Sequence, residues 1–257
     1  MILTKTTKLV FIISSSVILV TAAIAVPTVL LTRDNSIYFN LLENAGVMIE
    51  ANGVRIYVDP INLPDNYSDL PADAILITHD HGDHYDEASI DLLQKSDTLN
   101  VFPTYLTSHI THHDGLGVVP GDSFKVGSVE ITCFYMYTFA LGGFPSSHPI
   151  ENNYTSYLID TGSMTFFHAG DSANIPEYTQ LAGLVDVAML PLGPGCQTMA
   201  GMDVVFALDA IDASYFIPIH FLAGEEETFC ETYRTSIENL NCEIVELSHF
   251  SSYTFTP

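Results

Sequence analysis

Basic side chains are scarce in this sequence. Its 257 residues include 7 Lys and Arg against 31 Asp and Glu, which gives a formal net charge of −24 at pH 7. Lys5, Lys8 and Arg33 precede residue 35 together with a single acid, Asp34, so 4 basic and 30 acidic side chains remain in residues 35–257. Such a surface repels polyanions and offers no Lys/Arg cluster to neutralise phosphates, which argues against nucleic acid as a substrate or partner.

Closely spaced cysteine pairs and interdomain linkers are also missing. The four cysteines show no C-x-x-C spacing, which argues against a structural zinc knuckle. In an extracytoplasmic body Cys230 and Cys242 could close a short disulfide loop, and four buried thiols are the alternative. No repeat, low-complexity tract or Pro/Gly-rich linker interrupts residues 36–257. This indicates a single domain with one core.

One long apolar run is present, at residues 9–31. Its 23 uncharged residues would form a helix about 34 Å long, against a bilayer core of roughly 30 Å. We interpret residues 1–35 as a signal anchor, with the N-terminus in the cytoplasm and the catalytic domain outside, because Lys5 and Lys8 precede the run. The alternative is a signal peptide cleaved after Ala23-Ile24-Ala25, which would leave a secreted protein.

The remaining sequence predicts strands first in hairpins and later in alternation with helices. Residues 47–50 and 54–58 flank Asn52-Gly53, a pair typical of a type I′ hairpin turn. This order favours two sheets covered by helices. We expect further strands at residues 74–78, 129–137, 156–159, 164–167, 187–190 and 215–219, and helices at 86–95, 204–211 and 225–240.

A dense cluster of metal-ligand side chains follows the strand expected at residues 74–78. His79, His81, Asp83 and His84 fall within six residues, although the chain has only 10 histidines. Alternation along an extended segment sends His79 and His81 to the same side, and Gly82 permits a turn before Asp83 and His84. Imidazole and carboxylate together suit zinc, with manganese or iron as alternatives.

Three further candidates lie at the ends of later predicted strands. They are His148, Asp171 and His220, and with the first four they supply seven ligands, enough for two metal ions with open positions. Another histidine group, His109, His112 and His113, lies in a polar stretch, and we interpret its members as loop or surface residues, with a second metal site as the alternative.

The spacing of these residues resembles the metallo-β-lactamase superfamily across residues 38–221. Within it the sequence is most similar to small single-domain hydrolases that include the L-ascorbate-6-phosphate lactonase-like proteins, and more distantly to N-acylphosphatidylethanolamine-hydrolysing phospholipase D. The stretches that carry this similarity are Phe167-His168-Ala169-Gly170-Asp171-Ser172, Ile175-Pro176-Glu177, residues 185–193, Thr198-Met199 and Ile217-Pro218-Ile219-His220.

The resemblance implies an αββα sandwich of two mixed β-sheets flanked by helices, with the site along one edge. By position, one metal ion would be held by His79, His81 and His148, the other by Asp83, His84 and His220, and Asp171 would bridge them. This sequence departs from the family where relatives have a histidine near the domain start, since Asn44-Ala45-Gly46 stands there.

Two further residues are candidates for supporting roles. Asp59, after the first hairpin, would orient a ligand histidine, or simply end the strand. His168 is expected to pack or hydrogen-bond beside the ligands.

These features favour a hydrolase of an ester, lactone, amide or phosphodiester, in which two divalent metal ions, most simply Zn²⁺, activate water. Asp83 and Asp171 would be the catalytic carboxylates, and the substrate a small or lipid-derived molecule. The alternatives are an iron-dependent oxidoreductase of the same fold and a non-catalytic membrane-tethered protein that retains it.

Overall fold

The computed structural model describes residues 35–193, 195 and 197–257, and residues 35–257 form one compact unit. The predicted signal anchor lies almost wholly in residues 1–34, outside the described residues. Among the helices that the structure describes, none combines the length and the apolar character needed to cross a membrane.

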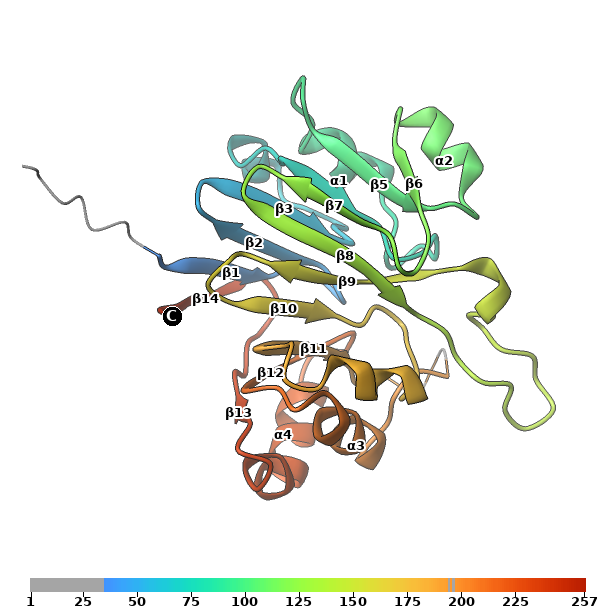
Figure 1. Cartoon of the computed structure of the whole chain (residues 1–257), viewed down its shortest axis with the longest axis vertical. Coiled ribbons are helices and arrows are strands. Elements are labelled where there is room, and N and C mark those ends of the chain that lie inside the picture. The colour runs from blue at the N-terminus through green and yellow to red at the C-terminus, as the bar shows by residue number, and fades with distance from the viewer. Residues whose placement is uncertain (1–34, 194, 196) are drawn as a thin grey trace, which may run out of the picture. The chain divides into compact units, whose positions relative to one another are not determined.

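Two seven-stranded mixed sheets form the centre of this unit (Figure 1). The strands of the first sheet are, in spatial order, β14 (Ser251–Phe255), β1 (Ile37–Leu41), β2 (Val47–Ala51), β3 (Val54–Val58), β4 (Ala74–Leu76), β5 (Leu99–Pro103) and β6 (Leu116–Val118). Those of the second are β13 (Glu243–Ile244), β12 (Tyr215–Ile219), β11 (Val187–Pro191), β10 (Thr165–His168), β9 (Thr155–Asp160), β8 (Val129–Tyr135) and β7 (Ser123–Val126).

The two sheets share a pattern of strand directions. In the first, β14, β1, β2 and β3 pair antiparallel, and β3, β4, β5 and β6 pair parallel. In the second, β7, β8, β9 and β10 pair antiparallel, and β10, β11, β12 and β13 pair parallel. Because parallel strands need crossover connections, the helices lie on the parallel halves. The crossover helices are α1 (Glu87–Leu92), α2 (Thr107–His112), α3 (Met202–Ile211) and α4 (Glu225–Glu238). The 3₁₀ helices η1 (Asp65–Asp69) and η3 (Pro176–Leu181) also lie between parallel strands, whereas η2 (Ile150–Asn152) lies between the antiparallel β8 and β9.

Alternation along the strands builds the layers. In β3, Ile56 and Val58 point into the core between the sheets, whereas Tyr57 points outward, toward a separate cluster that includes Ile90 of α1. Between the sheets, Phe39 of β1 stacks on Phe166 of β10, with ring centroids 6.3 Å apart. The predicted αββα sandwich is thereby confirmed (Figure 1).

The local predictions succeed where a turn or a long buried run determines the structure. Asn52 and Gly53 both have positive φ, 56° and 79°, as a type I′ turn requires. The helix predicted at residues 86–95 is observed as α1, from Glu87 to Leu92. Asp86 stands just before its first residue as the N-cap, where its side chain accepts hydrogen bonds from the backbone of Ala88 and Ser89.

The structure decides between alternatives that the sequence left open. His109 and His112 belong to helix α2 and not to a loop; His112 is exposed at the surface, whereas His109 and His113 stack their rings on Phe102 of β5. Cys133, Cys230 and Cys242 are buried free thiols rather than disulfide partners, and Cys196 lies outside the described residues.

Packing between the sheets predicts a contrast between two neighbours on β1. Phe39 is fully buried and Tyr38 is 40% exposed. Phe39→Ala should lower the free energy of unfolding by about 3–5 kcal/mol, because it opens a cavity between the sheets. Tyr38→Ala should cost less than about 1 kcal/mol. Urea unfolding followed by circular dichroism measures both, and equal losses would contradict the sandwich packing.

Candidate metal centre

The candidate ligands lie at one edge of the sandwich. Strands β4, β10 and β12 end there and deliver the loop of residues 79–84 (the histidine loop), Asp171 and His220 respectively. Because β9 runs antiparallel to β10, the start of β9, with His148 upstream of it, lies at the edge where β10 ends. Four segments that are far apart in the sequence thus meet at a single place.

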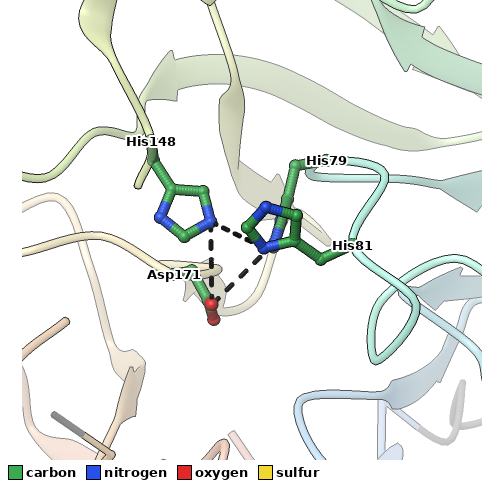
Figure 2. A group of neighbouring side chains, drawn as sticks. All are labelled: His79, His81, His148 and Asp171. Atoms are coloured by element: carbon green, nitrogen blue, oxygen red, sulfur yellow. Dashed lines mark hydrogen bonds and ion pairs between the residues drawn. The ribbon is translucent and has the colours of Figure 1, made fainter. Parts of the chain in front are cut away.

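One group of ligands, the first group, consists of His79, His81 and His148 around one oxygen of Asp171 (Figure 2). The ligand atoms of these four residues lie within 4.8 Å of one another. Nε2 of His79 and Nε2 of His148 each lie 3.8 Å from Oδ2 of Asp171, and Nδ1 of His81 lies 3.2 Å from Nε2 of His148. Three imidazole nitrogens therefore face one carboxylate oxygen.

Asp83, His84 and His220 form the second group, around the other oxygen of Asp171. Nε2 of His84 lies 3.0 Å and Nε2 of His220 lies 3.4 Å from Oδ1 of Asp171. Oδ2 of Asp83 lies 3.4 Å from Nε2 of His220. Since Oδ2 of Asp171 faces the first group and Oδ1 faces the second, this carboxylate stands between them as a bridging ligand would.

The unsatisfied polar atoms show that the site fits metal ions. Nε2 of His79, His84 and His220 and both carboxylate oxygens of Asp171 are buried without a hydrogen-bond partner. Buried polar atoms are normally paired, so this concentration needs an explanation. Zinc ligands at 2.0–2.2 Å from the ion stand about 3.3–3.6 Å apart in tetrahedral geometry. The separations of 3.0–3.8 Å to Asp171 match that spacing.

Asp59 orients two of the ligand imidazoles. Its Oδ2 lies 2.8 Å from Nδ1 of His84 and 2.6 Å from the hydroxyl of Thr78. The Thr78 hydroxyl donates to Asp59 and in turn lies 2.9 Å from Nδ1 of His79. Protons on both Nδ1 atoms leave both Nε2 lone pairs facing the cluster, as metal ligation requires. These contacts make Asp59 an orienting group, although it also lies within ligand distance of His79 and His84.

Charge states in the metal-free protein follow from burial and from neighbouring charges. Burial and the surrounding imidazoles hold the pKa of His79 well below its ordinary value, and burial lowers the pKa of His148 to about 4. Burial also disfavours protonation of His84, yet the carboxylates of Asp171 and Asp59 raise its pKa well above the ordinary value. A cation would take the place of that proton, since metal ligands bind in their deprotonated forms.

Three residues at this edge have strained backbone. Asn44, Asp59 and His220 all have left-handed backbone, with φ of 56°, 46° and 53°. Such conformations cost non-glycine residues roughly 1–3 kcal/mol each and are found mainly at functional sites. Gly170 also has positive φ, and a Cβ added to it would lie 2.7 Å from Sδ of Met136. A side chain at this position, directly before Asp171, would therefore displace the Asp171 carboxylate.

Among the other candidates, His168 is a supporting residue. Its Nε2 donates to the carbonyl of Ala45 at 2.7 Å, and its Nδ1 accepts from the amide of Gly170 at 3.2 Å. Both ring nitrogens are occupied, so His168 ties the Asp171 turn to the segment before β2 and is not placed as a ligand. The group of His109, His112 and His113 lies on helix α2 and at its end, and it joins none of the ligand groups found among the described residues.

Asn44 is the site residue whose role the sequence did not reveal. Its Nδ2 donates to the carbonyl of Asp83 at 2.9 Å and lies 3.5 Å from Oδ2 of the same residue. Its own carbonyl accepts from the amide of His220 at 3.0 Å. One residue therefore holds two members of the second group. The sequence marked Asn44 only as a departure from the family pattern, because its contacts depend on the folded edge.

Comparisons with known proteins identify the family and the fold. A model of the beta-lactamase superfamily domain matches residues 38–220. A UPF0173 metal-dependent hydrolase from Bacillus thuringiensis (strain Al Hakam) is 31% identical over 194 residues, 68% of this chain and 81% of the relative.

Two solved structures share the fold. Igni18, a metallo hydrolase from Ignicoccus hospitalis, superposes with a TM-score of 0.70 at 18% identity, over 86% of this chain and 98% of that one. CmlA, a diiron β-hydroxylase from Streptomyces venezuelae, superposes with a TM-score of 0.63 at 15% identity, over 88% of this chain and 55% of its own.

Two ligand groups predict two metal ions that can be removed one at a time. The full chain reconstituted with zinc should hold two equivalents of the metal, and His148→Ala and His220→Ala should each hold about one. Asp171→Asn should hold less zinc than either histidine variant, because it removes the ligand that both groups share. Inductively coupled plasma mass spectrometry after desalting measures the content. His112→Ala changes an exposed histidine outside the site and should retain both. A wild-type content of one would contradict the two-group arrangement.

Asn44→Ala should loosen the second group alone. In a His148→Ala background, where only the second position remains, the change should weaken zinc binding by about tenfold to a hundredfold. In a His220→Ala background it should leave the affinity unchanged. Competition with a chromophoric chelator measures both affinities, and Asn62→Ala serves as a control nearby. Equal effects in both backgrounds would show that Asn44 supports the fold rather than the second group.

Proposed function

The chain belongs to the beta-lactamase superfamily, and from this membership we propose that it is a metal-dependent hydrolase with two cations held by Asp171 and the six side chains around it. The observation that carries the proposal is the Asp171 carboxylate, which is fully buried among imidazoles without a hydrogen bond of its own and has one oxygen toward each ligand group. Relatives named as metal-dependent hydrolases support the reaction class.

Each part of the site has a defined task in this proposal. Two divalent cations, most simply zinc, would supply a water of lowered pKa and polarise the oxygen of the scissile group. Asp171 offsets the positive charge, and Asp59 keeps the imidazoles of His79 and His84 in the ligating tautomer. Asp83, whose side chain is 48% exposed, faces the open side, where its carboxylate can accept a hydrogen bond from the attacking water.

The reaction class that follows is attack of water on an acyl or phosphoryl centre. The substrates would be an ester, lactone, amide or phosphodiester, small or lipid-derived. We further propose that residues 1–35 anchor the chain in a membrane with the domain outside, on the strength of their uncharged run of 23 residues.

A different chemistry on the same ligands is the second candidate. CmlA, a diiron β-hydroxylase, has this fold, so the fold also serves an iron enzyme, and imidazole and carboxylate side chains are ligands that iron accepts. Metal analysis distinguishes the two: protein that takes up two iron atoms and consumes oxygen would favour the oxidoreductase. Loaded protein that is inert toward every substrate would favour the non-catalytic alternative.

The bridging carboxylate gives the direct test. Asp171→Asn keeps the shape of the side chain but removes its charge, so hydrolysis should fall by on the order of a hundredfold or more. The zinc-loaded full chain is assayed against ester, lactone, amide and phosphodiester substrates, with circular dichroism to verify folding. Asp91→Asn, an exposed acid on α1, is the matched control. Activity that survives Asp171→Asn would reject the bridging role.

A further inference from the structure

A pocket opens beside the second ligand group. It has a volume of about 440 Å³, within the range of small-molecule sites, and Asp83 forms part of its wall. Asn44, which holds Asp83 and His220, lines it as well. Because Asp83 lies in its wall, a molecule that fills the pocket contacts the second ligand group.

One wall of the pocket is apolar. Ile61, Phe221, Leu222 and Ala223 line it, and the Leu222 side chain is 75% exposed. Phe221 is held in place by His249, whose ring stacks on it at a centroid distance of 4.7 Å. Exposed leucine beside a ligand group gains free energy when an apolar group covers it, at roughly 25 cal/mol per Å² of buried apolar surface.

No cationic side chain is available to this pocket. Residues 35–257 contain four basic residues, and none of them is among the lining residues. Each is engaged elsewhere: Arg55 with Glu50, Lys95 with Asp73, Lys125 with Glu130 and Arg234 with Glu246. A carboxylate, sulfate or second phosphate on the substrate would therefore find no basic side chain in the wall.

The charged groups in the wall are acids. Glu43 is half-buried, and one of its oxygens accepts from Nδ2 of Asn62 at 3.1 Å. Asp83 is the other acid in the wall, and its Oδ2 lies 3.4 Å from Nε2 of His220. In a partly desolvated pocket these charges repel an anionic substituent more strongly than they would in open water.

We propose that this pocket binds an uncharged, apolar acyl or alkyl group of the substrate and that Glu43 excludes anionic substituents. The substrate class narrows to neutral esters, lactones or amides. This inference rests on the proposed hydrolysis for its chemistry, and on the pocket alone for its selectivity.

The first test compares two esters that differ by one charge, 4-nitrophenyl pentanoate and 4-nitrophenyl hemiglutarate. On the zinc-loaded full chain, kcat/KM for the neutral ester should exceed that for the anionic one by about tenfold or more. Glu43→Lys should reduce this ratio at least about tenfold, and Glu43→Gln should reduce it by less. Glu238→Lys makes the same change in net charge on α4, away from the pocket, and should leave the ratio unchanged.

The second test needs no catalysis. N-phenyl-1-naphthylamine and 1-anilinonaphthalene-8-sulfonate are similar apolar fluorophores, and only the second carries a negative charge. EDTA-treated full chain should bind the neutral probe more tightly, and Leu222→Asp should weaken its binding several-fold. Glu43→Lys should tighten binding of the sulfonate probe.

The two tests separate failure of the inference from failure of the proposed function. Probe selectivity that responds to Glu43 and Leu222 supports the pocket even if no ester is hydrolysed, in which case the reaction class is wrong. An ester ratio that is unchanged by Glu43→Lys, or that shifts equally with Glu238→Lys, overturns the role of Glu43. Preference of the wild type for the anionic ester or probe overturns the proposal as a whole.

Discussion

Burial of the Asp171 carboxylate is the constraint on which this edge of the molecule depends. A charge without solvent costs several kcal/mol unless other charges compensate it, and here the surrounding imidazoles, with the cations that we propose they bind, would compensate it. The backbone around Asp171 is fixed accordingly. Gly170 turns with positive φ against Thr78 and Met136, and His168 anchors the same turn to Ala45. The carboxylate is thereby held where both its oxygens meet ligands.

The sandwich gives this site its rigidity. Asn44, Asp59 and His220 hold left-handed backbone in the segments that leave β1, β3 and β12. An isolated loop would relax from such conformations, but here each residue is tied to a neighbour from another segment. The Asn44 carbonyl binds the His220 amide, and the Asp59 carboxylate binds Thr78. The buried strands behind them therefore maintain strain that a free segment would lose.

Sequence patterns anticipate the features that local chemistry determines. The Asn52-Gly53 turn, strand β12 and the cluster at His79 could be predicted because short-range spacing encodes them. Strands β1 and β14 could not: each has exposed residues, and they are defined by pairing with each other across the whole length of the domain. The same reason hides Asn44 and His249. Both reach the site edge only because β1 ends and β14 begins there, and neither lies in a motif.

The acidic composition of the domain bears on which substrates could reach this edge. Two divalent cations would meet three buried or half-buried carboxylates, Asp59, Asp83 and Asp171, so one positive charge remains to polarise a carbonyl oxygen. Residues 35–257 carry 27 further acids and only 4 Lys and Arg residues, and each of these four pairs with an acid away from the pocket. The metal centre would then be a point of positive charge on a predominantly anionic surface. Such a field suits a substrate whose charge develops only during the reaction, since a permanent anion would be repelled before it reached the metals.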